Sequence, residues 1–222
     1  MLAAVVLTTA STRAQDVFED PRLAPVREGL EETVEAARAD GLPQELLTDK
    51  VREGLAKRVP PPRIAAAVRM MLGHMRTADR MVRGVPPHAE VGRHDLVRYT
   101  TEALMAGADA GPLGRLVEAV AEDAAPKQAA PLVREGMVVV AELAERGIEG
   151  SLAARSALQA YRTQGRRGWG ALLRAVRTLG RASPAERARA VRQAAERPGR
   201  GAPGLDGHPH GGPKGRAKGK GQ

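Results

Sequence analysis

A cluster of methionine and histidine side chains between residues 70 and 81 is the part of the sequence most similar to a metal site. A helix would place Met71 and Met75 on one face, because they are four residues apart, with His74 beside them. Thioether and imidazole groups are ligands that suit Cu(I). However, methionine is also a flexible filler of protein cores, and only one histidine joins the cluster. We therefore expect these side chains to pack in the core, and we assign no metal site.

The C-terminal residues offer a second chemistry, the binding of anions. Residues 197–222 are rich in glycine and proline and hold six basic residues against one acidic residue, a net charge of +5. This composition predicts a disordered tail, and a flexible chain of cations attracts polyanions with an affinity that falls with salt. The candidate anion-binding residues are Arg197, Arg200, Lys214, Arg216, Lys218 and Lys220. A solubilising tail without a ligand is the alternative.

The sequence carries no pattern typical of an enzyme. It has no His-Glu-x-x-His motif, no nucleophile elbow and no phosphate-binding loop. With no cysteine, thiol catalysis, disulfides and cysteine-ligated zinc are excluded. One Phe, two Tyr and one Trp argue against a surface that stacks nucleic-acid bases, and we expect Trp169 to be a packing residue more than an interface anchor. We predict a non-enzymatic protein without a cofactor.

Arginine dominates the positive charge of the chain. It supplies 29 of the 35 basic residues, and the formal net charge is +9. We attribute this bias mainly to genomic base composition, so we infer no ligand from it. The acidic residues, such as Glu31, Glu32 and Glu118, are spaced as solvated faces of helices.

An internal repeat is the clearest structural signal. The tetrad Val-Arg-Glu-Gly followed by a large apolar residue occurs at residues 26–30, 51–55 and 133–137. Aligning the first copy with the third, with a one-residue deletion, pairs Gly41-Leu42 with Gly147-Ile148. Both copies therefore predict a helix, a tight glycine turn and a second helix. Such a unit cannot bury its apolar face alone, so neighbouring copies must stack.

Glycine recurs inside the repeated helices, at Gly29, Gly54 and Gly136. Glycine in a helix interior costs about 1 kcal/mol relative to alanine, so three glycines at one motif position suggest a purpose. No phosphate-loop pattern surrounds them, which argues against contact with a ligand. We predict a close helix crossing at each of the three.

Proline and glycine divide the chain at intervals suited to short antiparallel helices. The expected helices cover residues 21–39, 44–57, 63–82, 88–105, 111–123, 126–146, 150–161, 169–179 and 184–196. The junctions Gly-Leu-Pro at 41–43, Arg-Val-Pro-Pro at 58–61 and Gly-Val-Pro-Pro at 84–87 are expected to be equivalent, and Ser183, Pro184 and Glu186 predict a capping box. We predict an all-α domain over residues 17–196, an array or bundle of about nine short helices in solenoid-like hairpin repeats.

The N-terminal segment resembles a secretory signal. Residues 1–14 form a short apolar run ending in small residues, with Thr12 and Ala14 placed for cleavage before Gln15. The run is too short to span a bilayer, so we expect no transmembrane segment and a periplasmic or secreted mature protein. No basic residue precedes Arg13, so a cytoplasmic protein is the alternative.

The residues around the second copy of the repeat carry a family resemblance. They read Gly-Leu-Pro at 41–43, Leu-Leu at 46–47, Lys-Val-Arg-Glu-Gly-Leu-Ala-Lys at 50–57, Val-Pro at 59–60 and Arg-Ile at 63–64. This run resembles the GxPxxLLxxKVxEGLAKxVPxxRI-type repeats of uncharacterised exported bacterial α-helical proteins. The resemblance covers residues 26–72 well. It implies an exported helical-repeat protein and brings no known activity or catalytic residues.

Two functions follow from the sequence as hypotheses. The first is an exported, non-enzymatic helical-repeat protein that acts as a binding or scaffold protein of the bacterial cell envelope, with an unknown protein partner. The second is a polyanion-binding protein that holds nucleic acid or lipopolysaccharide through its basic tail, with the helical body only presenting that tail.

Overall fold

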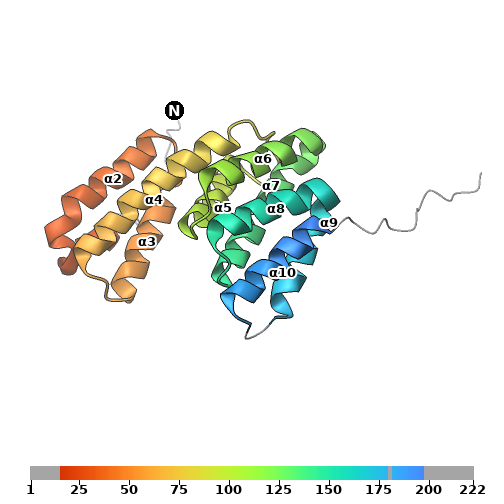
Figure 1. Ribbon diagram of the computed structural model, residues 1–222. Helices are drawn as coiled ribbons and strands as arrows, with labels where there is room; N and C mark the ends of the chain where they lie inside the picture. Colours follow the sequence, from red (N-terminus) through yellow and green to blue (C-terminus); the bar gives the residue numbers. More distant parts are fainter. Residues whose placement is uncertain (1–15, 180–181, 198–222) are drawn as a thin grey trace, which may run out of the picture.

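Nine α-helices follow two short 3-10 helices in the computed structural model of the protein, which describes residues 16–179 and 182–197 (Figure 1). The 3-10 helices are η1 (Asp16–Glu19) and η2 (Pro21–Val26). The α-helices are α2 (Arg27–Ala39), α3 (Glu45–Ala56), α4 (Pro61–Val82), α5 (Arg93–Met105), α6 (Ala110–Asp123), α7 (Pro126–Glu145), α8 (Gly150–Gln164), α9 (Arg166–Arg177) and α10 (Pro184–Glu196). The described residues contain no strand, so the all-α prediction is confirmed. The predicted signal, 1–14, and the predicted tail beyond Arg197 lie outside them.

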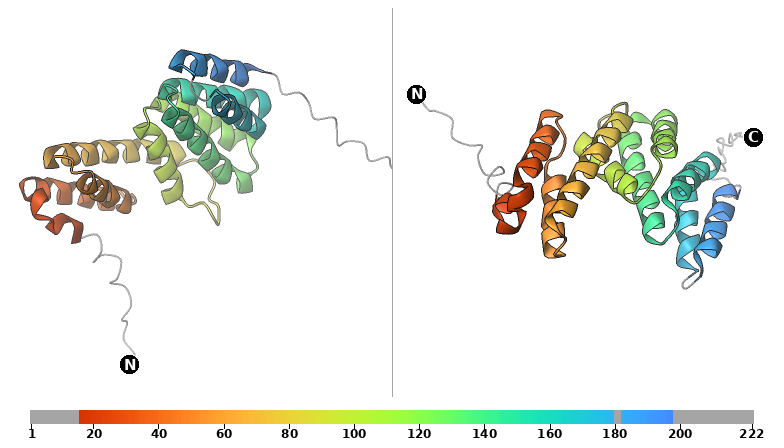
Figure 2. Two further views of the ribbon diagram at one scale, coloured as in Figure 1. Left: turned by 90° about the horizontal axis from the view of Figure 1, so that it is seen from below. Right: turned by 60° about the vertical axis from the view of Figure 1, so that its left-hand side comes forward.

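The helices stack into an elongated array, with α2 near one end and α10 near the other (Figure 1, Figure 2). Both α2 and α3 pack on α4, and α4 continues past them to pack on α5 and α6. Helix α7 packs on α5, α6 and α8, while α8, α9 and α10 each contact the other two. The predicted array of short helices is therefore observed, and the long α4 joins α2 and α3 to the rest.

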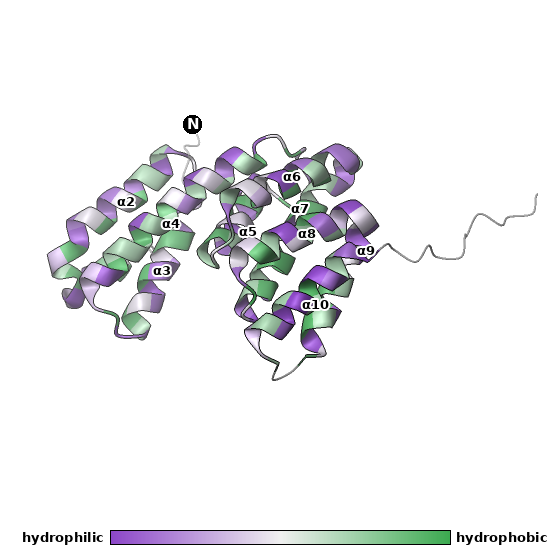
Figure 3. Cartoon of the chain, viewed as in Figure 1, coloured by the Kyte–Doolittle hydropathy of each residue, from purple (hydrophilic) through white to green (hydrophobic). Residues whose placement is uncertain are grey.

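Apolar stripes on the helices make the core. Figure 3 shows hydrophobic and hydrophilic residues in alternating bands along the helices, as expected where one face of each is buried. On α4 the buried stripe includes Val68, Met71 and Met75, with Met75 fully buried. His74, beside them, is only half-buried. The two methionines that could ligate copper are thus packed in the core.

A glycine turn of one type ends three of the helices, α2, α5 and α7. In the first, Gly41 has φ 66° and donates to the Arg38 carbonyl, while the Leu42 N–H donates to the Ala37 carbonyl. Gly147, with φ 79°, makes the same pair of bonds with Ile148, as the alignment of the two repeats predicted. Gly107 and Ala108 repeat the pattern. Each is a Schellman C-cap followed by a buried apolar residue.

Only one of the two Val-Pro-Pro junctions is equivalent to these turns. Arg58 takes φ 55° without being glycine, and the Val59 N–H donates to the Gly54 carbonyl, so residues 58–61 match. The junction at 84–87 does not match, because Gly84 does not have a positive φ and residues 83–92 form a longer loop.

Helix α5 consequently begins at Arg93, and the prediction that it begins near residue 88 is wrong. Pro86 and Pro87 bring no N–H groups to an early helical turn. The start is set instead by Asp95, whose carboxylate accepts from the Gly92 N–H at 3.0 Å. The buried Asp79 carboxylate accepts from Arg83 at 3.2 Å and from Arg93 at 2.7 Å, which ties the two ends of the loop together.

Three other helix boundaries differ from the predictions. Residues 21–26 form η2 instead of the first turns of α2, where Pro25 lies inside the segment. Helix α8 extends to Gln164, and α9 begins at Arg166, because Gly165, with φ 60°, ends one helix and starts the next directly. The capping box predicted at Ser183 is present, and its hydroxyl accepts from the Glu186 N–H.

The three repeat glycines have different surroundings. A Cβ at Gly54 would lie 2.7 Å from the buried Ile64 side chain, and one at Gly136 would lie 3.1 Å from the Trp169 ring. A Cβ at Gly29 would meet nothing within 4 Å. The predicted close crossing therefore holds at α3 against α4 and at α7 against α9, and it is wrong for α2.

We expect leucine to test this difference. Gly54→Leu and Gly136→Leu each force a side chain into an occupied crossing, and each should lower the free energy of unfolding by about 2 kcal/mol or more. Gly29→Leu is the matched control, because its Cβ enters open space, and it should change stability by at most about 1 kcal/mol. Urea unfolding followed by circular dichroism measures all three. A Gly54→Leu protein as stable as the wild type would contradict the close crossing.

Candidate anion-binding surface

Positive charge is concentrated in the last three helices. Residues 150–197 hold eleven arginines and two glutamates, a net charge of +9, whereas residues 1–149 hold 19 basic and 23 acidic residues, a net charge of −4. Residues 198–222 add five basic residues and one acidic residue. This uneven distribution of charge can be read from the sequence, but the net charge of the whole chain does not show it. Base composition alone does not explain the difference between the segments.

Helix α9 is held in place by two close contacts, each of which involves a glycine. A Cβ at Gly168 would lie 2.4 Å from the Ala160 carbonyl oxygen of α8, so only glycine fits there. The next residue, Trp169, is 1% exposed, and its ring lies against Gly136 of α7. Together these contacts fix α9 against both α7 and α8.

Trp169 also makes specific interactions with α8. Its indole Nε1 donates to the Ala157 carbonyl at 3.0 Å, which satisfies the one polar atom of the buried ring. The ring stacks on Tyr161 with centroids 5.3 Å apart. The prediction that Trp169 is a packing residue is therefore confirmed, and the arginines that flank it are directed outward.

Six arginines around this three-helix group are exposed and make no ion pair within the described residues. On α9, Arg167 and Arg174 are seven residues apart, so they share one outward face. Arg162 lies in the last turn of α8. The full set is Arg162, Arg167, Arg174, Arg189, Arg192 and Arg197. These guanidinium groups can pair with phosphate or carboxylate groups of a ligand without giving up an internal ion pair.

Two further arginines of α9 are used internally, as links to α7. Arg166 pairs with Glu135 at 2.7 Å, and Arg177 pairs with Glu142 at 2.8 Å. Glu142 also accepts from Arg146 at 3.0 Å. The hydrogen bond from Arg177 and that from Arg146 outweigh the effect of burial and hold the pKa of Glu142 below its ordinary value. The two ion pairs orient α9 along α7.

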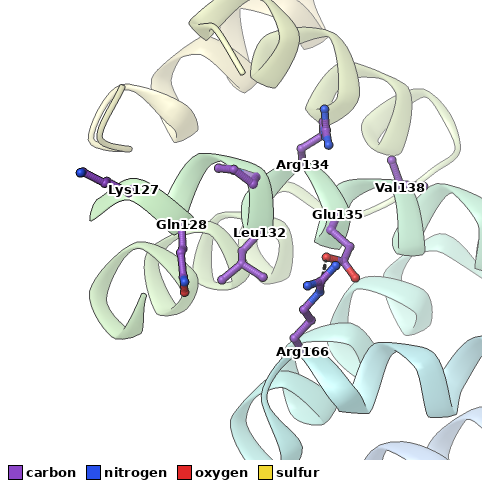
Figure 4. A pocket seen from close by; sticks show the side chains of 8 residues that line it. Lys127, Gln128, Leu132, Arg134, Glu135, Val138 and Arg166 are labelled. Atoms are coloured by element: carbon purple, nitrogen blue, oxygen red, sulfur yellow. Dashed lines mark ion pairs between the residues drawn. The ribbon is translucent and has the colours of Figure 1, made fainter. Parts of the chain in front are cut away.

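A hollow of about 600 Å³ lies on the outer face of α7, beside the first turn of α9 (Figure 4). Figure 4 shows Glu135 and Arg166 pointing toward each other from the two helices. The lining residues are Lys127, Gln128, Pro131, Leu132, Arg134, Glu135, Val138 and Arg166. Its floor is apolar and its polar lining is mainly basic, so it differs in chemistry from the outward arginines of α8 to α10.

Among the six basic residues that the sequence singles out in the tail, only Arg197 lies in the described residues. It directly follows α10 and is exposed. Arg200, Lys214, Arg216, Lys218 and Lys220 lie outside the described residues. The basic segment at 197–222 is thus continuous in the chain with the basic helices, a connection that the tail composition alone did not reveal.

The histidines of the body take local contacts. The His88 ring nitrogen Nδ1 accepts from the Glu90 N–H at 3.1 Å, and His94 Nε2 lies 3.1 Å from the Gly41 carbonyl oxygen. Across residues 16–179 and 182–197, no three His, Cys, Asp or Glu side chains are grouped so that they could hold a metal ion. In the same residues, no helix combines the length and the apolar character needed to cross a membrane.

Comparison of the chain with protein-family profiles, with curated proteins and with solved structures found no match. The functional proposal therefore rests on the chemistry of the surface.

The Glu142 network predicts a pH-dependent contribution to stability. Because its pKa is lowered in the folded protein, Glu142 stabilises the fold above its ordinary pKa of 4.5, and this contribution is lost as the pH falls below that value. Glu142→Gln should lower the free energy of unfolding by about 1 kcal/mol at pH 7. The difference from the wild type should become smaller as the pH is lowered from 7 to 3, through the ordinary pKa of 4.5. Urea titrations at both pH values measure it, and an equal difference at both would contradict the network.

Proposed function

We propose that this protein is a non-enzymatic helical-repeat binding protein that holds a phosphate-bearing polyanion on the basic surface of α8, α9 and α10. The observation that carries the proposal is the segregation of charge, with a net +9 over residues 150–197 and −4 over residues 1–149. A surface with this local charge attracts a polyanion even though residues 1–149 carry a net negative charge.

The type of side chain favours phosphate as the partner group. All eleven basic residues in this part of the chain are arginine, whose planar guanidinium can donate two parallel hydrogen bonds to one phosphate. The two aromatic residues of the same part, Tyr161 and Trp169, are buried and stack on each other. Without an exposed aromatic ring, bases cannot be stacked there, so binding should follow the charge of the polymer and not its sequence.

A polyanion ligand also accounts for the basic segment beyond α10. The six basic residues of 197–222 continue the charge of the helical surface and would lengthen the contact with a polymer. This proposal differs from binding by the tail alone, because here the folded helices supply contacts of their own.

We further propose that the protein acts in the bacterial cell envelope. The support is the apolar run at residues 1–14, with its small residues before Gln15, and the resemblance of residues 26–72 to repeats of exported proteins. In that compartment, the phosphate groups of lipopolysaccharide are the polyanion to test first, and duplex DNA serves as a second phosphate polymer.

Two outward arginines of α9 provide the sharpest test. The wild type should bind both polymers, with an affinity that falls steeply as the salt concentration rises. Arg167→Ala/Arg174→Ala should weaken binding and reduce the slope of log affinity against log salt for duplex DNA by about two, one for each phosphate that an arginine no longer neutralises. Fluorescence anisotropy over a range of salt concentrations measures this slope.

Arg63→Ala/Arg69→Ala is the matched control, since these arginines of α4 are also exposed and make no ion pair within the described residues. It should bind as the wild type does. A chain that ends at Arg197 should keep the difference between the two double variants. The proposal is wrong if neither polymer binds, or if removal of 198–222 abolishes binding while Arg167→Ala/Arg174→Ala has no effect, which would favour the tail alone.

A further inference from the structure

The hollow on α7 has the dimensions of a short helix. Its lining on α7 runs from Lys127 to Val138, which is about 16 Å along the helix axis, or three turns. Arg166 of α9 forms part of one side. A site of this length is large for a single small ion and is matched by a peptide segment of about three turns.

The apolar residues of the hollow are arranged as a helix-binding stripe. Pro131 and Val138 are spaced at i and i+7, so they lie along one side of α7 two turns apart, and Leu132 lies at the edge of this side. Val138 is 42% exposed, and it and Met70 are the large hydrophobic side chains that the described residues leave exposed. Leu132 and Pro131 are half-buried. Leu132 packs partly against the core, and Val138 is the residue of this stripe that the described chain leaves exposed.

A helical occupant fits this surface better than an extended one. The hollow lies on a helix and offers no strand edge, so an extended peptide would find no ladder on which to satisfy its own N–H and C=O groups. A helix satisfies these groups internally and needs only side-chain contacts from the hollow.

The charges around the stripe select an acidic occupant. Arg166 is neutralised by Glu135 at 2.7 Å. Lys127 and Arg134 are exposed and make no ion pair within residues 16–179 and 182–197, so they leave the hollow with two uncompensated positive charges. Like charges on a bound helix would be repelled, and carboxylates flanking its apolar stripe would pair with these two groups.

We propose that the hollow on α7 docks an acidic amphipathic helix of a partner protein, with apolar residues of that helix on Leu132 and Val138 and its carboxylates on Lys127 and Arg134. This interaction is separate from the polyanion surface of α8 to α10, because it needs the apolar stripe as well as positive charge. The protein then binds one protein partner at the hollow on α7 and a polyanion at the basic surface of α8 to α10.

Selection from a peptide library on the immobilised full chain tests the proposal. The library holds 16-residue helical peptides on an alanine and glutamine background. Three positions at i, i+4 and i+7 vary between leucine and serine, and the flanking positions vary between glutamate and lysine. Peptides with leucine at all three positions and glutamate flanks should be enriched at least tenfold over their lysine-flanked counterparts.

Four variants locate the binding. Leu132→Ser/Val138→Ser should remove the enrichment, and Met70→Ser, at the other exposed large hydrophobic residue, should retain it. Arg167→Ala/Arg174→Ala should also retain it, which separates this site from non-specific attraction to the basic helices. Arg134→Glu should shift the selection from glutamate toward lysine flanks, and because Arg134 is exposed on the helix surface it tests the site even if the double serine variant does not fold.

Circular dichroism confirms that each variant used is folded. The proposal is overturned if no leucine peptide is enriched, if a folded Leu132→Ser/Val138→Ser protein still selects the same peptides, or if Arg134→Glu leaves the preference for glutamate unchanged. Loss of enrichment in Arg167→Ala/Arg174→Ala would also overturn it, since binding would then depend on the polyanion surface.

Discussion

The packing of Trp169, on α9, against α7 and α8 is the interaction on which the functional half of the molecule depends. Its ring lies against Gly136 of α7, its Nε1 donates to the Ala157 carbonyl of α8 at 3.0 Å, and the residue itself belongs to α9. In a chain with four aromatic residues, this one supplies the largest fully buried side chain. Because a side chain at Gly136 would collide with the ring, the glycine of the repeated motif sets the distance between α7 and α9.

The packing of Trp169 also determines which arginines of α9 are exposed. With the apolar face of α9 fixed inward, Arg166 and Arg177 reach the two glutamates of α7, while Arg167 and Arg174 remain exposed without an internal partner. The first pair of arginines orients the helix, and the second is available to a ligand. Crowded like charges destabilise a protein, but they can be tolerated here because the packing beneath them is close and two glutamates of α7 pair with arginines of α9.

Local signals made much of the fold predictable, while the site depended on tertiary packing. The glycine turns at Gly41 and Gly147 could be predicted because a positive φ favours glycine and the next residue is apolar. The length of the loop at 83–92 could not be predicted, since two prolines indicate that a helix ends but not how many residues the loop spans. The hollow on α7 required the position of Arg166 beside Glu135, two residues far apart in sequence. The basic surface could be inferred from the positions of the arginines, but only when the net charge is counted segment by segment.

Hydrogen–deuterium exchange, followed residue by residue with and without lipopolysaccharide, is the measurement that tests the central claim most directly. The account predicts that bound polymer slows exchange in α8, α9 and α10 and leaves α2 and α3 unchanged, because the former carry a net positive charge and the latter a net negative charge. Slower exchange in α2 and α3, or an equal change along the whole array, would contradict it.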